Sequence, residues 1–110
     1  MDKALYWLWL QKALGYHAKI NNLVRYYGSA ERIYKAGENS WRSSGLFGDD
    51  IPASKILSMK KTSPEECKRI LMLCENEGIS VVRPEDESYP EELLKLSDFP
   101  AVLYVKGDFS

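Results

Sequence analysis

Seven consecutive apolar residues near the start of the chain, Ala4 to Leu10 (ALYWLWL), decide how this sequence folds. The run is far shorter than the roughly 20 residues needed to cross a bilayer, so it predicts a buried helix. Asp2 is placed to cap that helix, and Gly15 follows its expected end at about Leu14. Because apolar side chains surround this helix on nearly all sides, other helices must pack around it.

Further helices are predicted on both sides of a polar stretch. Apolar residues at helical spacing predict a helix from Ile20 that ends at Gly28, and Ser29 is placed to cap a short third helix that ends before Gly37. The stretch 38–50 is rich in Asn, Ser and Gly, and we interpret it as a loop with one helical turn. Pro52 then occupies the first position of a helix that runs through about Lys60.

The clearest helix start is Ser63-Pro64-Glu65-Glu66, a capping box with proline at the first helical position. The helix that it opens carries Cys67 and Cys74 on one face and stops at Gly78. We expect the helices to form a bundle with an apolar core. The predicted core residues are Leu8, Leu10, Leu14, Ile20, Leu23, Val24, Ile33, Ile56, Ile70 and Leu71.

After Gly78 the pattern changes. Residues 79–82 and 101–105 are short β-branched runs typical of strands, and a turn and a short helix from Pro90 lie between them. The charge changes sign at the same place: residues 1–75 hold twelve basic and eight acidic side chains, whereas residues 76–110 hold three and eight. We therefore predict a helical domain over 1–77 and the start of an α/β domain over 78–110, and we interpret the chain as a fragment.

Composition excludes several classes of protein. The net charge of −1 excludes a histone-like binder that acts through bulk charge, and two cysteines cannot supply a four-ligand zinc site. His17 is the only histidine and has no acidic neighbour in sequence, so no catalytic dyad, metal site or cofactor site is predicted.

Cys67 and Cys74 lie seven residues apart on one helix, too far for a disulfide, and are expected to be buried thiols. Without a secretory signal, a cytoplasmic protein is the simplest expectation.

The segment Gly15–Ile20 joins the first two helices and resembles a helix–hairpin–helix unit. Such units turn backbone N–H groups and lysines toward a DNA phosphate. This hypothesis makes five residues candidate DNA contacts: Lys12, Gly15, His17, Lys19 and Arg25. The family pattern has a second glycine where this chain has His17. The alternative is an αα-hairpin that needs glycine at its corner.

Aromatic residues offer a second route to nucleic acid. Trp7, Trp9, Tyr26 and Tyr27 are candidate stacking platforms for single-stranded bases, although aromatics beside helical stripes are more often core. We favour the core interpretation for this group. Tyr26 is the exception, because it lies off the apolar stripe beside Arg25 and is expected to be partly exposed.

The C-terminal segment resembles the entry to the Rossmann-like domain of the DprA (Smf) family of DNA-processing proteins. The resemblance is strongest over 78–107 and looser upstream, where Gly28 to Ala36 is similar to a helical turn of that family's N-terminal domain. The motifs that carry it are Ile79–Val82, Pro84-Glu85-Asp86, Tyr89-Pro90 with Leu93, Pro100, and Leu103–Gly107.

The resemblance implies a mainly α fold: a small bundle of four or five helices, SAM-like or helix–hairpin–helix-like, followed by a β-α-β extension that begins a Rossmann-like domain. It implies a non-enzymatic parent protein that binds single-stranded DNA during natural transformation, assists loading of the RecA recombinase and self-associates. That family's best-known DNA-contacting motif would lie after Ser110. The matched residues Tyr89, Pro90, Pro100 and Gly107 are expected to be framework residues.

Two other functions remain open at this stage. The helical domain is a candidate docking module with Tyr26 and Trp41 as exposed anchors. A nucleotide-binding enzyme of the Rossmann-like class is disfavoured, because the sequence holds neither a Gly-rich phosphate loop nor a catalytic base.

Overall fold

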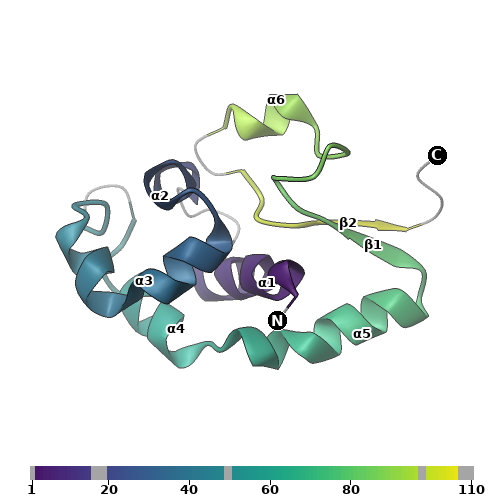
Figure 1. Cartoon of the computed structure of the whole chain (residues 1–110), viewed down its shortest axis with the longest axis horizontal. Coiled ribbons are helices and arrows are strands. Elements are labelled where there is room, and N and C mark those ends of the chain that lie inside the picture. Colours follow the sequence, from purple (N-terminus) through teal and green to yellow (C-terminus); the bar gives the residue numbers. More distant parts are fainter. Residues whose placement is uncertain (1, 16–19, 49–50, 97–98, 107–110) are drawn as a thin grey trace.

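The computed structural model describes residues 2–15, 20–48, 51–96 and 99–106. These residues form a mainly helical structure with one small antiparallel sheet (Figure 1). In chain order the elements are α1 (Lys3–Leu14), α2 (Ile20–Tyr27), α3 (Ala30–Ser43), α4 (Lys55–Lys61), the 3₁₀ helix η1 (Pro64–Cys67), α5 (Lys68–Asn76), β1 (Ile79–Val82), α6 (Glu91–Leu94) and β2 (Leu103–Lys106). The coarse prediction, a mainly helical fold that ends in two strands with a short helix between them, is confirmed. The two strands are antiparallel, unlike the parallel pair of a β-α-β unit, and the SAM-like and Rossmann-like assignments stay predictions.

Helix α1 lies at the centre of the molecule (Figure 1), packed against α3, α4 and η1. The Asp2 carboxylate accepts a hydrogen bond from the Ala4 N–H at 2.9 Å, and Gly15 ends the helix by donating its N–H to the Gln11 carbonyl at 2.8 Å. Ten of the twelve residues of α1 are buried. The predicted cap, end and all-round burial of this helix are confirmed.

Trp9 is the focus of the packing around α1. Its side chain is fully buried, and its indole N–H donates to the carbonyls of Thr62 at 2.8 Å and Met59 at 3.3 Å. Its ring lies 5.1 Å from that of Tyr34 and 6.1 Å from that of Trp41, measured between centroids. One side chain therefore links α1 to α3 and to the end of α4.

Helix α3 corrects two predictions. It does not end before Gly37 but continues to Ser43, with Gly37 in a non-helical conformation (φ 83°, ψ 173°) inside it. Residues 38–43, predicted as loop, are helical because the kink at Gly37 turns Trp41 into the core. Trp41 is 4% exposed and its indole N–H donates to the Ile33 carbonyl at 2.7 Å, so the expectation of an exposed anchor was wrong.

Helices α4 and α5 differ from the prediction in their first turns. Helix α4 begins at Lys55, three residues after Pro52. The Ser63 hydroxyl accepts from the Glu65 N–H at 3.2 Å as a cap, but the turn that follows is 3₁₀ before α5 begins. Cys67 and Cys74 are free and buried, as expected, and burial raises the pKa of the Cys67 thiol.

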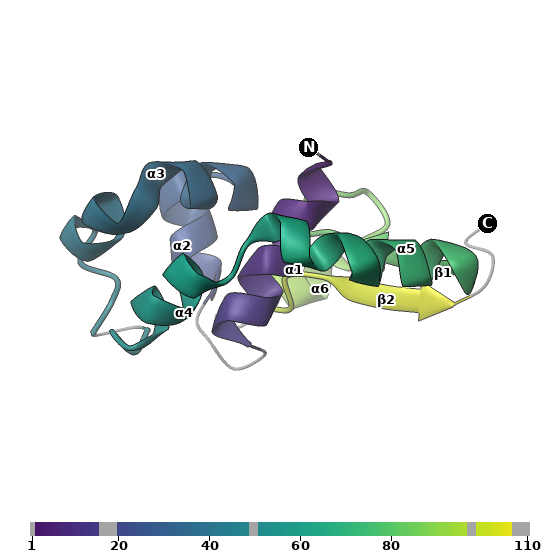
Figure 2. The ribbon, with the colours of Figure 1, turned by 90° about the horizontal axis from the view of Figure 1, so that it is seen from below.

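The strands pair antiparallel, with Ile79 opposite Lys106 and Val82 opposite Leu103. The bounds of β1 match the prediction, whereas β2 begins two residues later than expected because Leu103 is opposite Val82, the last residue of β1, and the Ala101 N–H donates to Gln11 instead. Helix α5 lies alongside this sheet (Figure 2). The short helix predicted from Pro90 is α6.

Most of the buried apolar side chains form one cluster that includes residues from both predicted domains. Seven of the ten predicted core residues are buried, and Val24, Ile70 and Leu71 are half-buried at its edge. The C-terminal segment reaches α1 directly, since the Ala101 N–H donates to the Gln11 side-chain oxygen at 3.0 Å. The boundary between residues 77 and 78 stays a prediction.

Two of the expected framework residues contact each other. The Tyr89 hydroxyl donates to the Pro100 carbonyl at 2.7 Å, closing the segment between β1 and β2. Burial raises the pKa of Tyr89 to about 12. Pro90 occupies the N-cap position of α6, and Gly107 lies outside the described residues.

Candidate nucleic-acid interface

The structure describes three of the five predicted DNA contacts of the first hairpin. Lys12 is exposed on the last turn of α1, and its ammonium lies 3.4 Å from the Glu66 carboxylate of η1. Gly15 ends α1 with a φ of 81°. His17 and Lys19 lie outside the described residues. Arg25, on the last turn of α2, is exposed and has no carboxylate within 4 Å among the described residues.

The four aromatic residues fall into two groups. Trp7 and Trp9 are buried and Tyr27 is half-buried, as the core interpretation predicted. Tyr26 is 60% exposed, which confirms its expected exposure. Its ring lies edge-on to that of Tyr27 at a centroid distance of 4.8 Å, and the Tyr27 hydroxyl is hydrogen-bonded to the Ser40 hydroxyl at 2.9 Å. The exposed Tyr26 ring thus packs edge-on against Tyr27, and it is next in sequence to Arg25, which pairs with no carboxylate of the described residues.

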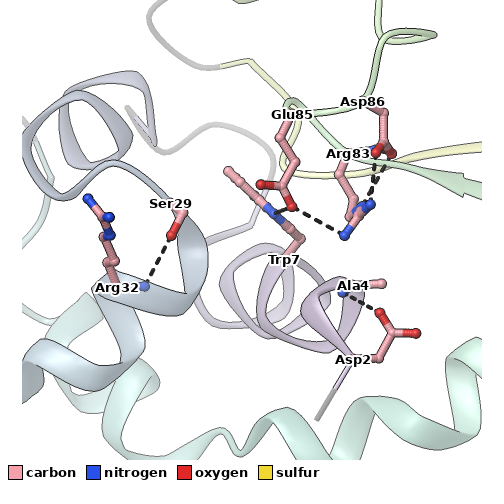
Figure 3. Close-up of polar contacts among 8 residues, drawn as sticks. All are labelled: Asp2, Ala4, Trp7, Ser29, Arg32, Arg83, Glu85 and Asp86. Carbon is pink, nitrogen blue, oxygen red and sulfur yellow. Dashed lines mark hydrogen bonds and ion pairs between the residues drawn. The ribbon is translucent and has the colours of Figure 1, made fainter.

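A polar pocket of about 400 Å³ lies where α1, the α2–α3 turn and the loop after β1 meet. Figure 3 shows Trp7 of α1 between the turn that carries Ser29 and the loop that carries Glu85. Residues from three distant segments line the pocket: Lys3, Trp7, Gly28, Ser29, Glu31, Arg32 and Glu85. No local sequence pattern joins these segments, and sequence reasoning therefore missed this site.

The carboxylates that line the pocket are engaged by other groups. Glu85 accepts a hydrogen bond from the Trp7 indole N–H at 3.2 Å and lies 3.2 Å from the Arg83 guanidinium. The Glu31 carboxylate lies 3.1 Å from the Lys35 ammonium, and this hydrogen bond raises the pKa of Lys35. These two acids therefore have cationic partners of their own.

Arg83 pairs with two carboxylates, those of Glu85 and Asp86, and so holds Glu85 in place on the pocket wall (Figure 3). Its guanidinium donates to the Asp86 carboxylate at 2.8 Å, and its backbone N–H donates to the same carboxylate at 2.8 Å. Burial pushes the pKa of Asp86 upward, but these hydrogen bonds outweigh burial and hold the pKa below its usual value. The hydrogen bond from Arg83 to Asp86 raises the pKa of Arg83.

The two cations of the pocket, Lys3 and Arg32, are exposed and form no ion pair with a carboxylate of the described residues. Arg32 lies against Gly28, whose φ is 100°: a Cβ there would sit 3.1 Å from the Arg32 Nη1. Ser29 caps α3, its hydroxyl accepting from the Arg32 N–H at 3.3 Å. The pocket suits an anion, because the side chains of Lys3 and Arg32 and the backbone of Gly28 all line it.

A second, more apolar pocket of about 230 Å³ adjoins the first and shares Trp7, Gly28 and Glu85 with it. Asn21 also lines it and is 8% exposed. Its side-chain amide has no hydrogen-bond partner among the described residues. The remaining lining residues are Val24, Pro84, Leu94 and Phe99.

No family model, curated protein or solved structure matches this chain. Within the described ranges, no three His, Cys, Asp or Glu side chains are grouped so as to hold a metal ion. None of the helices in the described part of the chain has the length and apolar character needed to cross a membrane.

Proposed function

We propose that this chain is an accessory DNA-contact module of a DprA-like DNA-processing protein. The parent protein would bind single-stranded DNA and assist RecA loading in natural transformation and recombination. The motifs between residues 78 and 107 support this family, and the exposed cations of the helical part support DNA contact.

One observation carries the proposal: the pair formed by Arg25 and Tyr26 on the last turn of α2. Arg25 is exposed and without an ion-pair partner among the described residues, and Tyr26 presents 60% of its surface to solvent. An exposed cation and an exposed aromatic ring at neighbouring positions suit a single strand, because the cation attracts the phosphate and the ring stacks on a base.

The charge of the helical part sets the kind of binding to expect. Its modest basic excess over residues 1–75 provides few phosphate contacts. The affinity for a single strand is therefore weak and independent of base sequence, and it falls as salt displaces the cations from phosphate. Lys12 contributes less than Arg25, since its ammonium already has a carboxylate partner in Glu66.

Fluorescence anisotropy of a labelled single-stranded oligonucleotide tests this function at low and at physiological salt. Arg25→Gln and Tyr26→Ala each weaken binding by about fivefold to tenfold, whereas the matched control Arg69→Gln on α5 leaves it unchanged. Binding that responds to neither salt nor these two substitutions would exclude the proposal.

An exposed apolar strip on α5 favours a second candidate function, docking of a partner protein. Met72 and Leu73 are 62% and 53% exposed on a helix that buries only Cys74. Titration of the ¹⁵N-labelled chain with RecA tests it: perturbations confined to α5 and abolished by Met72→Ser favour docking. Sedimentation at several concentrations tests the expected self-association separately.

A further inference from the structure

The two adjoining pockets differ in chemistry in a way that matches the two ends of a nucleotide. The larger pocket carries Lys3 and Arg32, and the smaller one is lined mainly by apolar groups. Trp7 lines both pockets, so a ligand that extends past its side chain occupies both. The larger pocket alone, at about 400 Å³, falls in the range of small-molecule sites, roughly 300–1,000 Å³.

The larger pocket is built to hold an anion. Lys3 and Arg32 approach it from different helices, and Gly28 presents backbone without a side chain. The acidic residues on its wall do not neutralise these cations, since Glu31 is paired with Lys35 and Glu85 with Arg83. A phosphate oxygen is the ligand that such a pair of cations recognises.

The smaller pocket is built to hold a flat, partly polar ring. Val24, Leu94 and Phe99 line it as apolar surfaces. Asn21 is 8% exposed as a residue, and it lines this pocket with a side-chain amide that forms no hydrogen bond within the described residues. The edge of a nucleobase offers both a donor and an acceptor to such an amide.

We propose that the two pockets together bind one nucleotide carrying a terminal phosphate. The phosphate lies between Lys3 and Arg32, and the base lies in the smaller pocket with its edge against Asn21. This site is separate from the Arg25–Tyr26 pair and goes beyond the proposed function, because it recognises a nucleotide end rather than the length of a strand.

The indole N–H of Trp7 reports on this site. The other two tryptophans donate to backbone carbonyls in the core, whereas the Trp7 indole donates to Glu85 on the pocket wall. In a ¹H–¹⁵N spectrum of the full chain, Trp7→Phe assigns its resonance. Titration with a nucleoside 5′-monophosphate should shift this resonance to saturation and leave the other two indole resonances in place.

Variants test the phosphate contact and the base contact separately. Arg32→Gln should weaken binding of the monophosphate about tenfold, as expected for loss of a charged hydrogen bond, with Arg69→Gln as the exposed control. Asn21→Ala should reduce the affinity to that of inorganic phosphate. The amide resonances of each variant show whether it is folded. Equal affinity for inorganic phosphate and for the monophosphate, or an unmoved Trp7 resonance at millimolar ligand, would overturn the proposal.

Oligonucleotides separate this proposal from the proposed function and identify the source of the phosphate. A strand with a 5′-phosphate should bind more tightly than the same strand with a 5′-hydroxyl, and Arg32→Gln should remove that difference. If the strand binds no more tightly than the free monophosphate, the natural ligand is the free nucleotide and the site stands. Loss of strand binding through Arg25→Gln, with the Trp7 response to monophosphate intact, means that the two sites act independently.

Discussion

Helices α1 and α5 are of similar length but are held in place in opposite ways. Ten of the twelve residues of α1 are buried, whereas α5 buries only Cys74 among its nine residues. Helix α1 begins at a capping Asp2 but owes its place to packing on several sides. Helix α5 lies at the edge of the molecule beside the two-stranded sheet (Figure 2), where local signals define its limits.

This difference in burial shows which region contributes most to the free energy of folding. Burial of apolar surface is the largest favourable contribution to folding, and in this chain it is concentrated around α1. The unit of α5 and the sheet contributes little of it, since its buried residues are Cys74 of α5 and Val82 of β1. We therefore expect substitutions of equal size to have very unequal effects in the two regions.

The largest effect is expected from truncating Trp9 at the centre of α1. Trp9→Ala should lower the free energy of unfolding by about 3–5 kcal/mol, because it leaves a cavity and two carbonyls without their donor. Leu73→Ala on α5, at a side chain 53% exposed, should change it by less than about 0.5 kcal/mol. Urea unfolding followed by circular dichroism measures both. Should Trp9→Ala not fold, Trp9→Phe gives the same ranking, and equal losses at the two sites would break the comparison.

Gln11 tests how firmly the C-terminal segment is attached to α1. Gln11→Ala removes the acceptor of the buried Ala101 N–H and should cost about 1–3 kcal/mol. Hydrogen exchange should accelerate at Ala101 and the strands before it accelerates within α1. Uniform acceleration throughout the chain would show instead that the two regions unfold as one unit. Lys12→Ala, at the exposed neighbouring position, is the control.

Tyr89 gives the C-terminal region a pH dependence of its own. Tyr89→Phe removes the hydrogen bond to the Pro100 carbonyl and should cost about 1 kcal/mol at neutral pH. Because burial raises the pKa of Tyr89 to about 12, the folded state keeps its proton where the unfolded chain loses it. This stabilisation is complete below pH 10 and is lost as pH rises toward 12. The free energy of unfolding, measured with urea, should therefore fall more steeply between pH 10 and 12 for the wild type than for Tyr89→Phe. The same pH dependence in both proteins would contradict this role of Tyr89.

The smallest effect is expected at the ion pair between Lys12 and Glu66. Both side chains are about half exposed, so Lys12→Ala should change the free energy of unfolding by less than about 0.5 kcal/mol, and salt should remove that difference. Thermal unfolding at two salt concentrations measures it. A loss above 1 kcal/mol would show that α1 and η1 depend on this contact more than its exposure implies.

Several helix ends and one strand were predictable from local signals. Asp2, Gly15 and the Ser63 cap lie where the structure has helix ends, and the bounds of β1 were predicted correctly. The failure at residues 38–43 has a tertiary cause. A glycine followed by Glu, Asn and Ser is typical of a loop. In the structure this segment is helical, with Trp41 packed near Trp9 and Glu38 paired with Lys60 of α4.

The candidate site was predictable in part for the same reason. The exposure of Tyr26 beside Arg25 follows from the helical stripe of α2, a local pattern. The pocket between Lys3, Arg32 and Glu85 joins positions up to 82 residues apart in sequence, and only the folded chain brings them together. Nothing in the spacing of these residues indicates that they share a pocket.

The kink at Gly37 has a genetic consequence. Its φ of 83° with ψ of 173° is a conformation open essentially to glycine alone, yet no atom lies within 4 Å of the position that a Cβ would take. A substitution there strains the backbone while displacing no neighbour, so the contacts of Trp41 with the core still form in the cold. Residue 37 is therefore a place in this chain where a screen for temperature-sensitive alleles should find mutants.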